Sequence, residues 1–351
     1  MSKIKVVVAG VGNCCSALVQ SIHYHAENPK GLMNYDLGGF KPSDIQVVGG
    51  IDVDSRKVGR DLSEAIFAEP NVAPKFYNPP PSGVVVVKGP ILDGADGVLK
   101  DVIKVDGTPP VDVSSYLEEL DADILACLLP TGAQKAVECY ADAALKAGYA
   151  FINCTPAKIA SDNRWAESFE DRGLPLAGDD LMSQMGGTVF HMGVLDFLAK
   201  RGIDVTKTYQ LDIGGTVEAY GVLEDFRREE KRKIKSEAIR QVLPADSKVA
   251  TGTSDYVGFM RDCRTGYFYV EGKNCLGSDV IIDIYLRTHD SANGAGILLD
   301  VIRGVKIAIE RGIGGQLTSI SSYGFKNPPI RSSLNESVEW FMSFVKGERK
   351  R

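Results

Sequence analysis

Hydrophobic residues follow two different patterns along the chain, and the pattern changes near residue 190. Before that point, β-branched residues form short runs without alternation, as in strands of a parallel sheet that is buried on both faces. These runs lie at residues 4–10, 44–54, 123–130 and 149–156. Beyond residue 190, apolar and polar residues alternate at 208–215, 267–273 and 279–290. Alternation of this kind predicts antiparallel strands whose two faces have different surroundings.

Apolar positions with helical spacing separate the predicted strands. We expect helices at residues 14–26, 55–67, 132–148 and 294–311. Residues 70–112 break this rhythm and form a long irregular insertion with one short strand. The fold class is therefore predicted to be α/β, with a Rossmann-type doubly wound sheet and an inserted α+β domain. Residues 1–190 and 297–351 would form the nucleotide-binding domain, and residues 191–296 the catalytic and oligomerisation domain.

Composition excludes several classes of protein. The 351 residues carry a formal net charge of −6, which gives no reason to expect a nucleic-acid partner. No apolar run approaches the roughly 20 residues needed to span a bilayer, so no membrane partner is expected. The chain starts directly in a strand-like segment without a leader cleavage site, and we expect a cytoplasmic protein. The seven scattered cysteines are interpreted as reduced thiols.

A glycine turn joins the first predicted strand to the first helix. Gly10 permits the tight turn, and Gly12 allows a pyrophosphate to approach the helix N-terminus. Cys15 replaces the third glycine of the usual fingerprint. Asp52 ends the second strand, where a carboxylate binds the adenosine ribose and repels the 2′-phosphate of NADP. We therefore predict NAD as the cofactor, the alternative being an ordinary strand–helix turn with a surface acid.

Lysines are the candidate catalytic residues. Lys231 and Lys235 are four residues apart and share one helix face, although a solvated charged helix has the same spacing. Residues 178–188 are a candidate phosphate site at a helix N-terminus, and Lys326 stands alone before a proline pair. Converging lysines would bind a phosphate and lower one another's pKa, which leaves one of them neutral as a base.

Ten segments, matching in order and spacing, make the chain resemble the myo-inositol-1-phosphate synthase family, particularly its shorter bacterial and archaeal members. They are VAGVGNCCSALVQ, IDVDSRKVGRDLSEAIF, KGPILDG, LLPTG, GDDLMSQMG, KIKSEAI, SDYVG, HDSANGAGILLDVIR, RGIGG and YGFKNPP. The resemblance implies an NAD-dependent isomerase that converts D-glucose 6-phosphate to 1L-myo-inositol 1-phosphate in inositol and phospholipid biosynthesis. Oxidation at C5, enolisation, aldol ring closure and return of the hydride would leave NAD unchanged. The resemblance also implies a homotetramer in which the open sheet faces a partner subunit.

The same resemblance assigns functions to individual residues. Lys326 would transfer the proton at C5, while Lys231 and Lys235 would stabilise the oxyanion and the phosphate. The other implied catalytic residues are Lys248, Asp180 and Asp290. Cofactor contacts would come from Gly10, Gly12, Asn13, Cys14, Asp52, Pro130, Thr131, Pro156 and Asp179. The substrate phosphate would bind Ser183, Gln184 and Gly186. Participation of a divalent or monovalent cation is left open.

Three residues depart from the family pattern. Met182 stands where the family often has lysine, and Thr216 and Glu218 replace an asparagine and an aspartate. A related sugar phosphate is therefore a possible substrate. Two further alternatives are an ordinary NAD-dependent dehydrogenase, which would consume NAD stoichiometrically, and a non-catalytic NAD-bound oligomer.

Overall fold

The larger part of the molecule is a seven-stranded parallel sheet in the order β11-β6-β5-β4-β1-β2-β3. A computed structural model describes residues 3–351, with the backbone alone at 253–254. The order reverses at β1, as in doubly wound sheets, so the predicted fold class is confirmed. The strands are β1 Ile4–Ala9, β2 Ile45–Asp52, β3 Val86–Lys88, β4 Ile124–Cys127, β5 Ala150–Asn153, β6 Pro175–Ala177 and β11 Gly315–Gln316.

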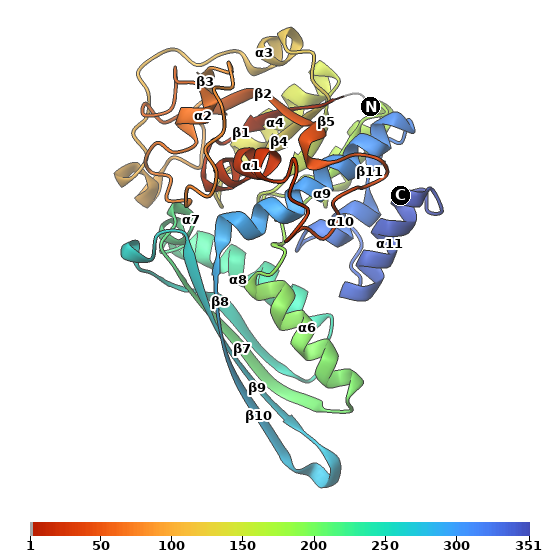
Figure 1. The fold of residues 1–351 in the computed structure, drawn as a ribbon. Coiled ribbons are helices and arrows are strands. Elements are labelled where there is room, and N and C mark those ends of the chain that lie inside the picture. Colours follow the sequence, from red (N-terminus) through yellow and green to blue (C-terminus); the bar gives the residue numbers. More distant parts are fainter. Residues whose placement is uncertain (1–2) are drawn as a thin grey trace.

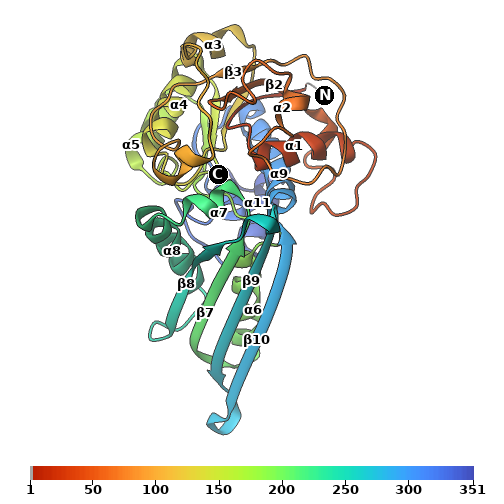
Figure 2. The same cartoon turned by 90° about the vertical axis from the view of Figure 1, so that its left-hand side faces the viewer.

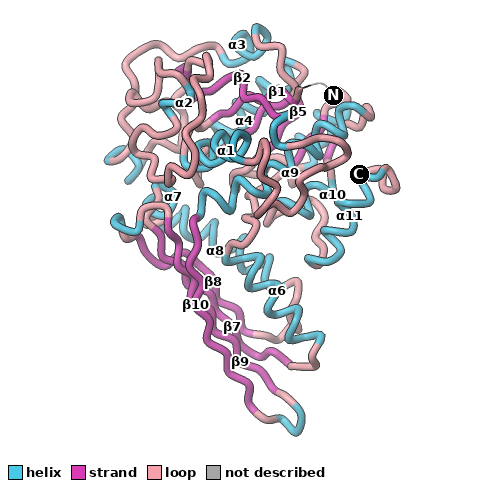
Figure 3. The backbone as a smooth tube through the Cα atoms, in the orientation of Figure 1, coloured by secondary structure: helices cyan, strands magenta, loops and turns pink. Residues whose placement is uncertain are grey.

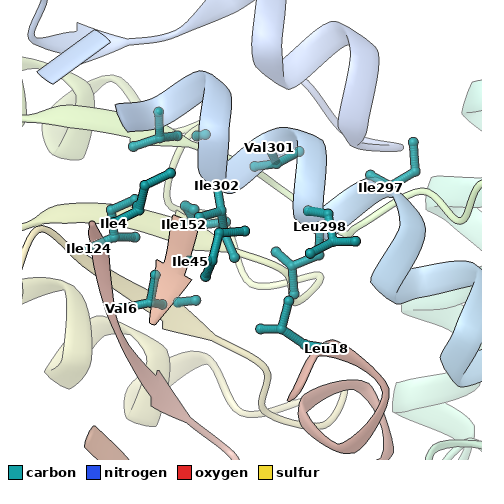
Figure 4. Packing of buried hydrophobic residues seen from close by; sticks show 14 of the residues in the cluster. Ile4, Val6, Leu18, Ile45, Ile124, Ile152, Ile297, Leu298, Val301 and Ile302 are labelled. Carbon is teal, nitrogen blue, oxygen red and sulfur yellow. The ribbon is translucent and has the colours of Figure 1, made fainter. Parts of the chain in front are cut away.

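Helices cover both faces of this sheet (Figure 1). They are α1 Asn13–Tyr24, α2 Leu62–Ala65, α3 Val113–Glu119, α4 Gln134–Ala147, α5 Asn163–Asp171, α9 Asp290–Glu310, α10 Thr318–Gly324 and α11 Leu334–Lys346. One apolar core lies between the sheet and α1, α9, α10 and α11, and a second lies between the sheet and α3, α4 and α5. Figure 4 shows part of the first core, in which Leu298 of α9 lies close to Leu18 of α1 and Ile302 of α9 lies on the side of Ile152 and Ile4. Because α9 comes after the smaller sheet in sequence, this packing fastens the two parts of the molecule together.

The smaller sheet has four strands in the order β10-β9-β7-β8. These strands are β7 Asp204–Gly214, β8 Lys248–Tyr256, β9 Cys263–Lys273 and β10 Asp279–His289. The antiparallel pairing of β7 with β9 and of β9 with β10 agrees with the alternating pattern, whereas β8 runs parallel to β7. Figures 1 and 3 show the sheet extending away from the larger part of the molecule.

Among the described residues, helices pack on one face of the smaller sheet. These are α6 Gly187–Lys200 and α8 Asp225–Arg240, while the short α7 Val217–Gly221 lies near the top of the sheet. Figure 2 shows the four strands side by side in front of α6, with their other face turned to the viewer. Among the described residues, no helix is long and apolar enough to cross a membrane.

Two element boundaries differ from the sequence prediction. The predicted helix at 55–67 is wrong over most of its length, because only Leu62–Ala65 is helical. Gly59 adopts a positive φ of 81°, and the backbone at 59–62 instead exchanges hydrogen bonds with Val84 and Val86 beside β3. In addition, α6 begins at Gly187 and α9 at Asp290, so the smaller sheet and its helices occupy residues 187–289.

Candidate active site

One continuous cavity lies between the two sheets, at the carboxyl ends of the parallel strands. The end of the cavity beside the larger sheet, called the far end below, is lined by Gly10 and Gly12 from the turn after β1 and by Asp52 at the end of β2. The end beside the smaller sheet, called the near end below, is lined by the first residues of α6, the helix-covered face of β7, the lysines of α8, Arg264, the start of α9 and Lys326. Residues separated by more than 300 positions in the sequence therefore face the same space.

The glycine turn has the geometry that a nucleotide site needs. Gly10 has a φ of 98°, and a Cβ there would stand 2.8 Å from the Leu128 carbonyl oxygen, so only glycine fits. A Cβ on Gly12 would meet no atom within 4 Å, which leaves the helix N-terminus open to a ligand. The Asp52 carboxylate accepts a hydrogen bond from the Val11 amide at 2.9 Å and lines the same cavity.

Six further residues were expected to contact the cofactor, and the structure divides them into two groups. Asn13, Cys14, Pro130 and Pro156 line the cavity. Thr131 and Asp179 do not line it, and their contact with the cofactor stays a prediction.

The structure gives both residues other partners. The Thr131 hydroxyl donates to Glu218, and its carbonyl oxygen accepts from Arg227. The fully buried Asp179 carboxylate binds Asn153, Ala160 and Ser161, and thereby holds the loop after β5 in place.

Three lysines from distant segments meet at the near end of the cavity. Lys326 Nζ lies 2.7 Å from Asp180 Oδ1, and Lys231 Nζ lies 3.3 Å from the same oxygen. Lys231 also contacts Glu218 Oε1 at 3.1 Å. Lys235, one turn further along α8, lies 2.6 Å from Asp212 Oδ2. The four-residue spacing predicted from the sequence therefore directs Lys231 and Lys235 into the cavity rather than into solvent.

Backbone hydrogen bonds hold Asp180 and Lys326 together. The Lys326 amide donates to the Asp180 carbonyl oxygen at 2.8 Å, and the Met182 amide donates to the Gly324 carbonyl oxygen at 2.7 Å. Asp180 adopts a positive φ of 61°, a strained conformation for a residue with a Cβ. Strained residues are concentrated at functional sites, where the surrounding structure enforces them.

The lysines have opposite pKa shifts. Burial lowers the pKa of Lys326, and the nearby positive charge of Lys231 adds to this shift against the opposing effect of Asp180. Burial also disfavours the charged form of Lys231, but Asp180 and Glu218 outweigh that effect and raise its pKa. The cluster therefore contains one lysine that is held charged and one that is easier to deprotonate, as a base requires.

Sequence reasoning misplaced one basic residue and missed another. Lys248 begins β8 on the surface and does not line the cavity, so its predicted place in the cluster is wrong. Arg264 of β9 lines the cavity instead, and its Nη2 lies 2.8 Å from Asp290 Oδ2. The antiparallel register pairs Arg264 with Thr288, two residues before Asp290. The alternating pattern predicts the strands but not their register, so this pairing could not be predicted from the sequence.

The predicted phosphate residues lie around the start of α6. Ser183 and Gly186 line the cavity, and the helix begins at Gly187 without a side-chain cap or an acidic residue in its first turn. Gln184 does not line the cavity, because its side chain donates to the Gly31 carbonyl oxygen at 2.9 Å. Its predicted contact with the phosphate is therefore wrong.

Within the described part of the chain, no group of three or more His, Cys, Asp and Glu side chains is arranged to hold a metal ion. The Asp290 carboxylate pairs with Arg264.

The ionised carboxylates of the lysine cluster should make the folding stability of the protein sensitive to acid. Burial alone would raise the pKa of Asp180 and of Glu218, but Lys231 together with Lys326 at Asp180, and with Thr131 at Glu218, lowers each to about 2. Because these pKa values are depressed, the stability they confer is present above about pH 4.5 and is lost as the pH falls toward 2. We expect the free energy of unfolding in urea to fall by a few kcal/mol between pH 5 and pH 3. A Glu218→Gln variant should lose less over this range, and an equal loss would contradict the assignment.

Chemically, the site combines a glycine turn whose geometry suits a nucleotide with a buried set of fixed positive charges. Such charges stabilise an oxyanion that develops on a bound substrate, because buried charges are weakly screened by solvent. A lysine of lowered pKa beside them is suited to move a proton.

Comparison with known proteins identifies relatives of this arrangement. A family model described as myo-inositol-1-phosphate synthase matches residues 186–291. The inositol-3-phosphate synthase of Mycolicibacterium smegmatis is 38% identical over 98% of both chains. The crystal structure of Ari2 is 31% identical and superimposes with a TM-score of 0.79 over 98% of this chain and 100% of that one. The Caenorhabditis elegans inositol-3-phosphate synthase, at 14% identity, shares the fold with a TM-score of 0.75 over 98% of this chain and 85% of its own. With a matching family model and full-length relatives at this identity, the chain belongs to the myo-inositol-1-phosphate synthase family.

Proposed function

We propose that the protein is an NAD-dependent isomerase that converts D-glucose 6-phosphate to 1L-myo-inositol 1-phosphate in inositol and phospholipid biosynthesis. The observation that carries this proposal is the meeting of Lys231, Lys235 and Lys326 in the cavity that also contains the nucleotide-binding turn. A dehydrogenase that only oxidises an alcohol needs one base, whereas ring closure also needs positive charge to stabilise an enolate.

The far end of the cavity fits a dinucleotide. Gly12 leaves room at the start of α1 for a pyrophosphate, and Asp52 stands at the end of β2, where it can bind a ribose. Asn13, Cys14, Pro130 and Pro156 form the adjoining walls. A bound NAD would supply reversible hydride transfer to and from the substrate. The carboxylate of Asp52 disfavours the 2′-phosphate of NADP.

The chain's own residues then hold the sugar and move its protons. Lys326, in its neutral form, removes the proton of the C5 hydroxyl as the hydride leaves. Lys231, which stays charged, stabilises the oxygen of the C5 ketone and of the enolate that forms when C6 loses a proton. Asp180 holds both ammonium groups through one oxygen and thereby fixes their separation. C6 then attacks the C1 aldehyde, and the proton that C6 lost ends on the new C1 hydroxyl. Lys326 returns its proton to the C5 oxygen as the hydride returns to C5.

The substrate phosphate binds at the start of α6. Ser183 and the free amides of the first turn donate hydrogen bonds, and the helix dipole favours the negative charge. Arg264 and Lys235 bring positive charge to the same end of the cavity. No acidic residue in the first turn of α6 competes with a bound anion.

The departures from the family pattern leave the lysine cluster intact, which speaks against the non-catalytic alternative. The Met182 side chain is buried. The Thr216 hydroxyl caps α7 by accepting a hydrogen bond from the Ala219 amide, and Glu218 is an ion-pair partner of Lys231.

The decisive experiment is an incubation of the purified protein with NAD and glucose 6-phosphate. Formation of inositol phosphate without net NADH supports the proposal. Accumulation of one NADH per sugar oxidised would identify an ordinary dehydrogenase. Retention of NAD with no turnover of any hexose phosphate would identify a non-catalytic protein.

We also propose a homotetramer in which the open face of the smaller sheet packs against a partner subunit. This face carries four tyrosines and two exposed aliphatic residues in neighbouring register positions: Tyr209, Tyr267, Tyr269, Tyr285, Leu211 and Ile281. An exposed apolar patch of this kind usually marks an interface. The cytoplasmic location stays a prediction from the sequence.

An Ile281→Asp substitution tests this interface. The side chain is 60% exposed in the single chain, so the substitution costs little in the monomer but buries a charge in an assembly. We expect light scattering to show a smaller species. Val338→Asp, at a 48% exposed apolar position on α11, is the matched control and should leave the mass unchanged. An unchanged mass for Ile281→Asp would exclude this face.

A further inference from the structure

A carboxylate oxygen without a partner lies beside the proposed phosphate site. Asp212 of β7 is 1% exposed and lines the cavity. Its Oδ2 accepts from Lys235 Nζ at 2.6 Å and from Gln210 Nε2 at 2.8 Å. Its Oδ1 is buried and accepts no hydrogen bond from any described residue. A buried charged acceptor in this state costs free energy unless a ligand supplies a donor.

The free oxygen faces the first residue of α6. A Cβ built on Gly187 would stand 3.1 Å from Asp212 Oδ1 and 2.4 Å from Gln210 Nε2. The same construction on Gly186 places the Cβ 3.2 Å from Ser183 Oγ. A Cβ built on Gly266 of β9 would stand 3.2 Å from the same Asp212 oxygen, which therefore lies between Gly187 and Gly266. Ser183, Gly186, Gly187 and Asp212 all line the same cavity, and the helix start has no side-chain cap.

These neighbours make opposite demands on a ligand. The amides of the helix start and the serine hydroxyl require an acceptor, preferably an anion. The carboxylate oxygen requires a donor and repels a second full charge, by about 4 kcal/mol for unit charges 4 Å apart at an effective dielectric constant of 20. A phosphate monoanion satisfies both demands, because it has two charge-sharing oxygens to accept and one P–OH to donate.

We propose that Asp212 is a specificity-determining residue that accepts a hydrogen bond from the P–OH of the substrate phosphate, so that the site selects a singly protonated phosphate group. This inference rests on the proposed function, because it places the phosphate of the sugar at the start of α6. It adds a requirement that the proposed reaction does not contain: binding takes up one proton whenever the free phosphate is a dianion.

The surroundings keep the proton on the phosphate rather than on the protein. Burial alone would raise the pKa of Asp212, but the charges of Lys235 and Arg264 outweigh burial and lower it. A phosphate monoester has its second pKa near 6. The other titratable group on this face is His191 of α6; burial lowers its pKa to about 4, so it stays neutral above pH 6. Arg264 stays charged because Asp290 and Asp212 raise its pKa against the effect of burial.

The test compares a phosphate ester, which can carry a proton on its anionic group, with a sulfate ester, which cannot. D-Glucitol 6-phosphate can carry a P–OH, whereas D-glucitol 6-sulfate is a monoanion without a proton at any pH of interest, and neither has an aldehyde with which to cyclise. Titration calorimetry on the NAD-loaded protein measures Kd at pH 6, 7 and 8. For the wild type, we expect the sulfate to bind at least about 30-fold more weakly than the phosphate at pH 6. We also expect Kd for the phosphate to rise about tenfold per pH unit above pH 7.

Asp212→Asn removes the charge and supplies an amide that can donate. In this variant, we expect the sulfate to bind within about threefold of the phosphate, and the pH dependence to become nearly flat. Asp142→Asn, on the exposed face of α4, is the matched control and should behave as the wild type. If Asp212→Asn fails to retain NAD, the comparison of the two esters on the wild type still decides the proposal.

Equal binding of both esters by the wild type would overturn the inference, as would equal pH dependence in wild type and variant. If glucose 6-phosphate is converted to inositol phosphate but the esters are not distinguished, only this inference fails. If the wild type binds NAD but no phosphate ester at any pH, the proposed function fails with it.

Discussion

Lys326→Ala is expected to lower inositol-phosphate formation by at least about a thousandfold while NAD stays bound. General acid–base catalysis typically contributes a hundredfold to ten-thousandfold, and Lys326 is the lysine of the cluster whose pKa is lowered by burial and by Lys231. The measurement is product formation under saturating glucose 6-phosphate, together with the NAD content of the purified protein. Loss of NAD along with activity would place Lys326 in cofactor binding instead.

Lys248→Ala is the matched control for this variant. Lys248 is exposed at the start of β8 and does not line the cavity, so its removal should change turnover less than twofold. A large loss in Lys248→Ala would contradict the cluster as the structure defines it. The two variants together therefore test the place that the structure gives each lysine.

The half of the molecule that contains the parallel sheet and the glycine turn could be predicted from the sequence, because local patterns determine it. Uninterrupted β-branched runs identify buried parallel strands, and Gly10 has a positive φ that only glycine adopts readily. The helix predicted at 55–67 failed for an equally local reason. Helical spacing of apolar residues cannot reveal that Gly59 turns the backbone toward β3.

The near end of the cavity was only partly accessible. Lys231 and Lys235 share a helix face by spacing alone, which is why their pairing could be predicted. Arg264 and Asp212 come from two strands of the smaller sheet, and their approach depends on register and on which face the helices cover. An alternating pattern states that two faces differ but does not state which residues meet across the strands. The family resemblance placed Lys248 in the cluster, and no local feature of the sequence marks this residue as exposed.

Lys231→Met is expected to lower turnover by a hundredfold or more, and to move the acid limb of the pH profile to higher pH. The loss of rate follows from removing a buried charge that stabilises the developing oxyanion. The pH shift follows from the electrostatics of the pair: Lys231 lowers the pKa of Lys326, so its removal raises that pKa. Because Lys326 acts as a base only when neutral, a higher pKa requires a higher pH for the same rate.

Asp180→Asn should shift the same limb in the opposite direction. The Asp180 carboxylate raises the pKa of Lys326, so replacing it with an amide lowers that pKa further. The measurement is kcat/KM for glucose 6-phosphate as a function of pH in the wild type and both variants. Purely structural damage would reduce the rate at every pH without moving the limb, and it would not move the limb in opposite directions for the two substitutions. Opposite shifts would therefore identify Lys326 as the titrating group, because it is the described residue that faces both charges at this end of the cavity.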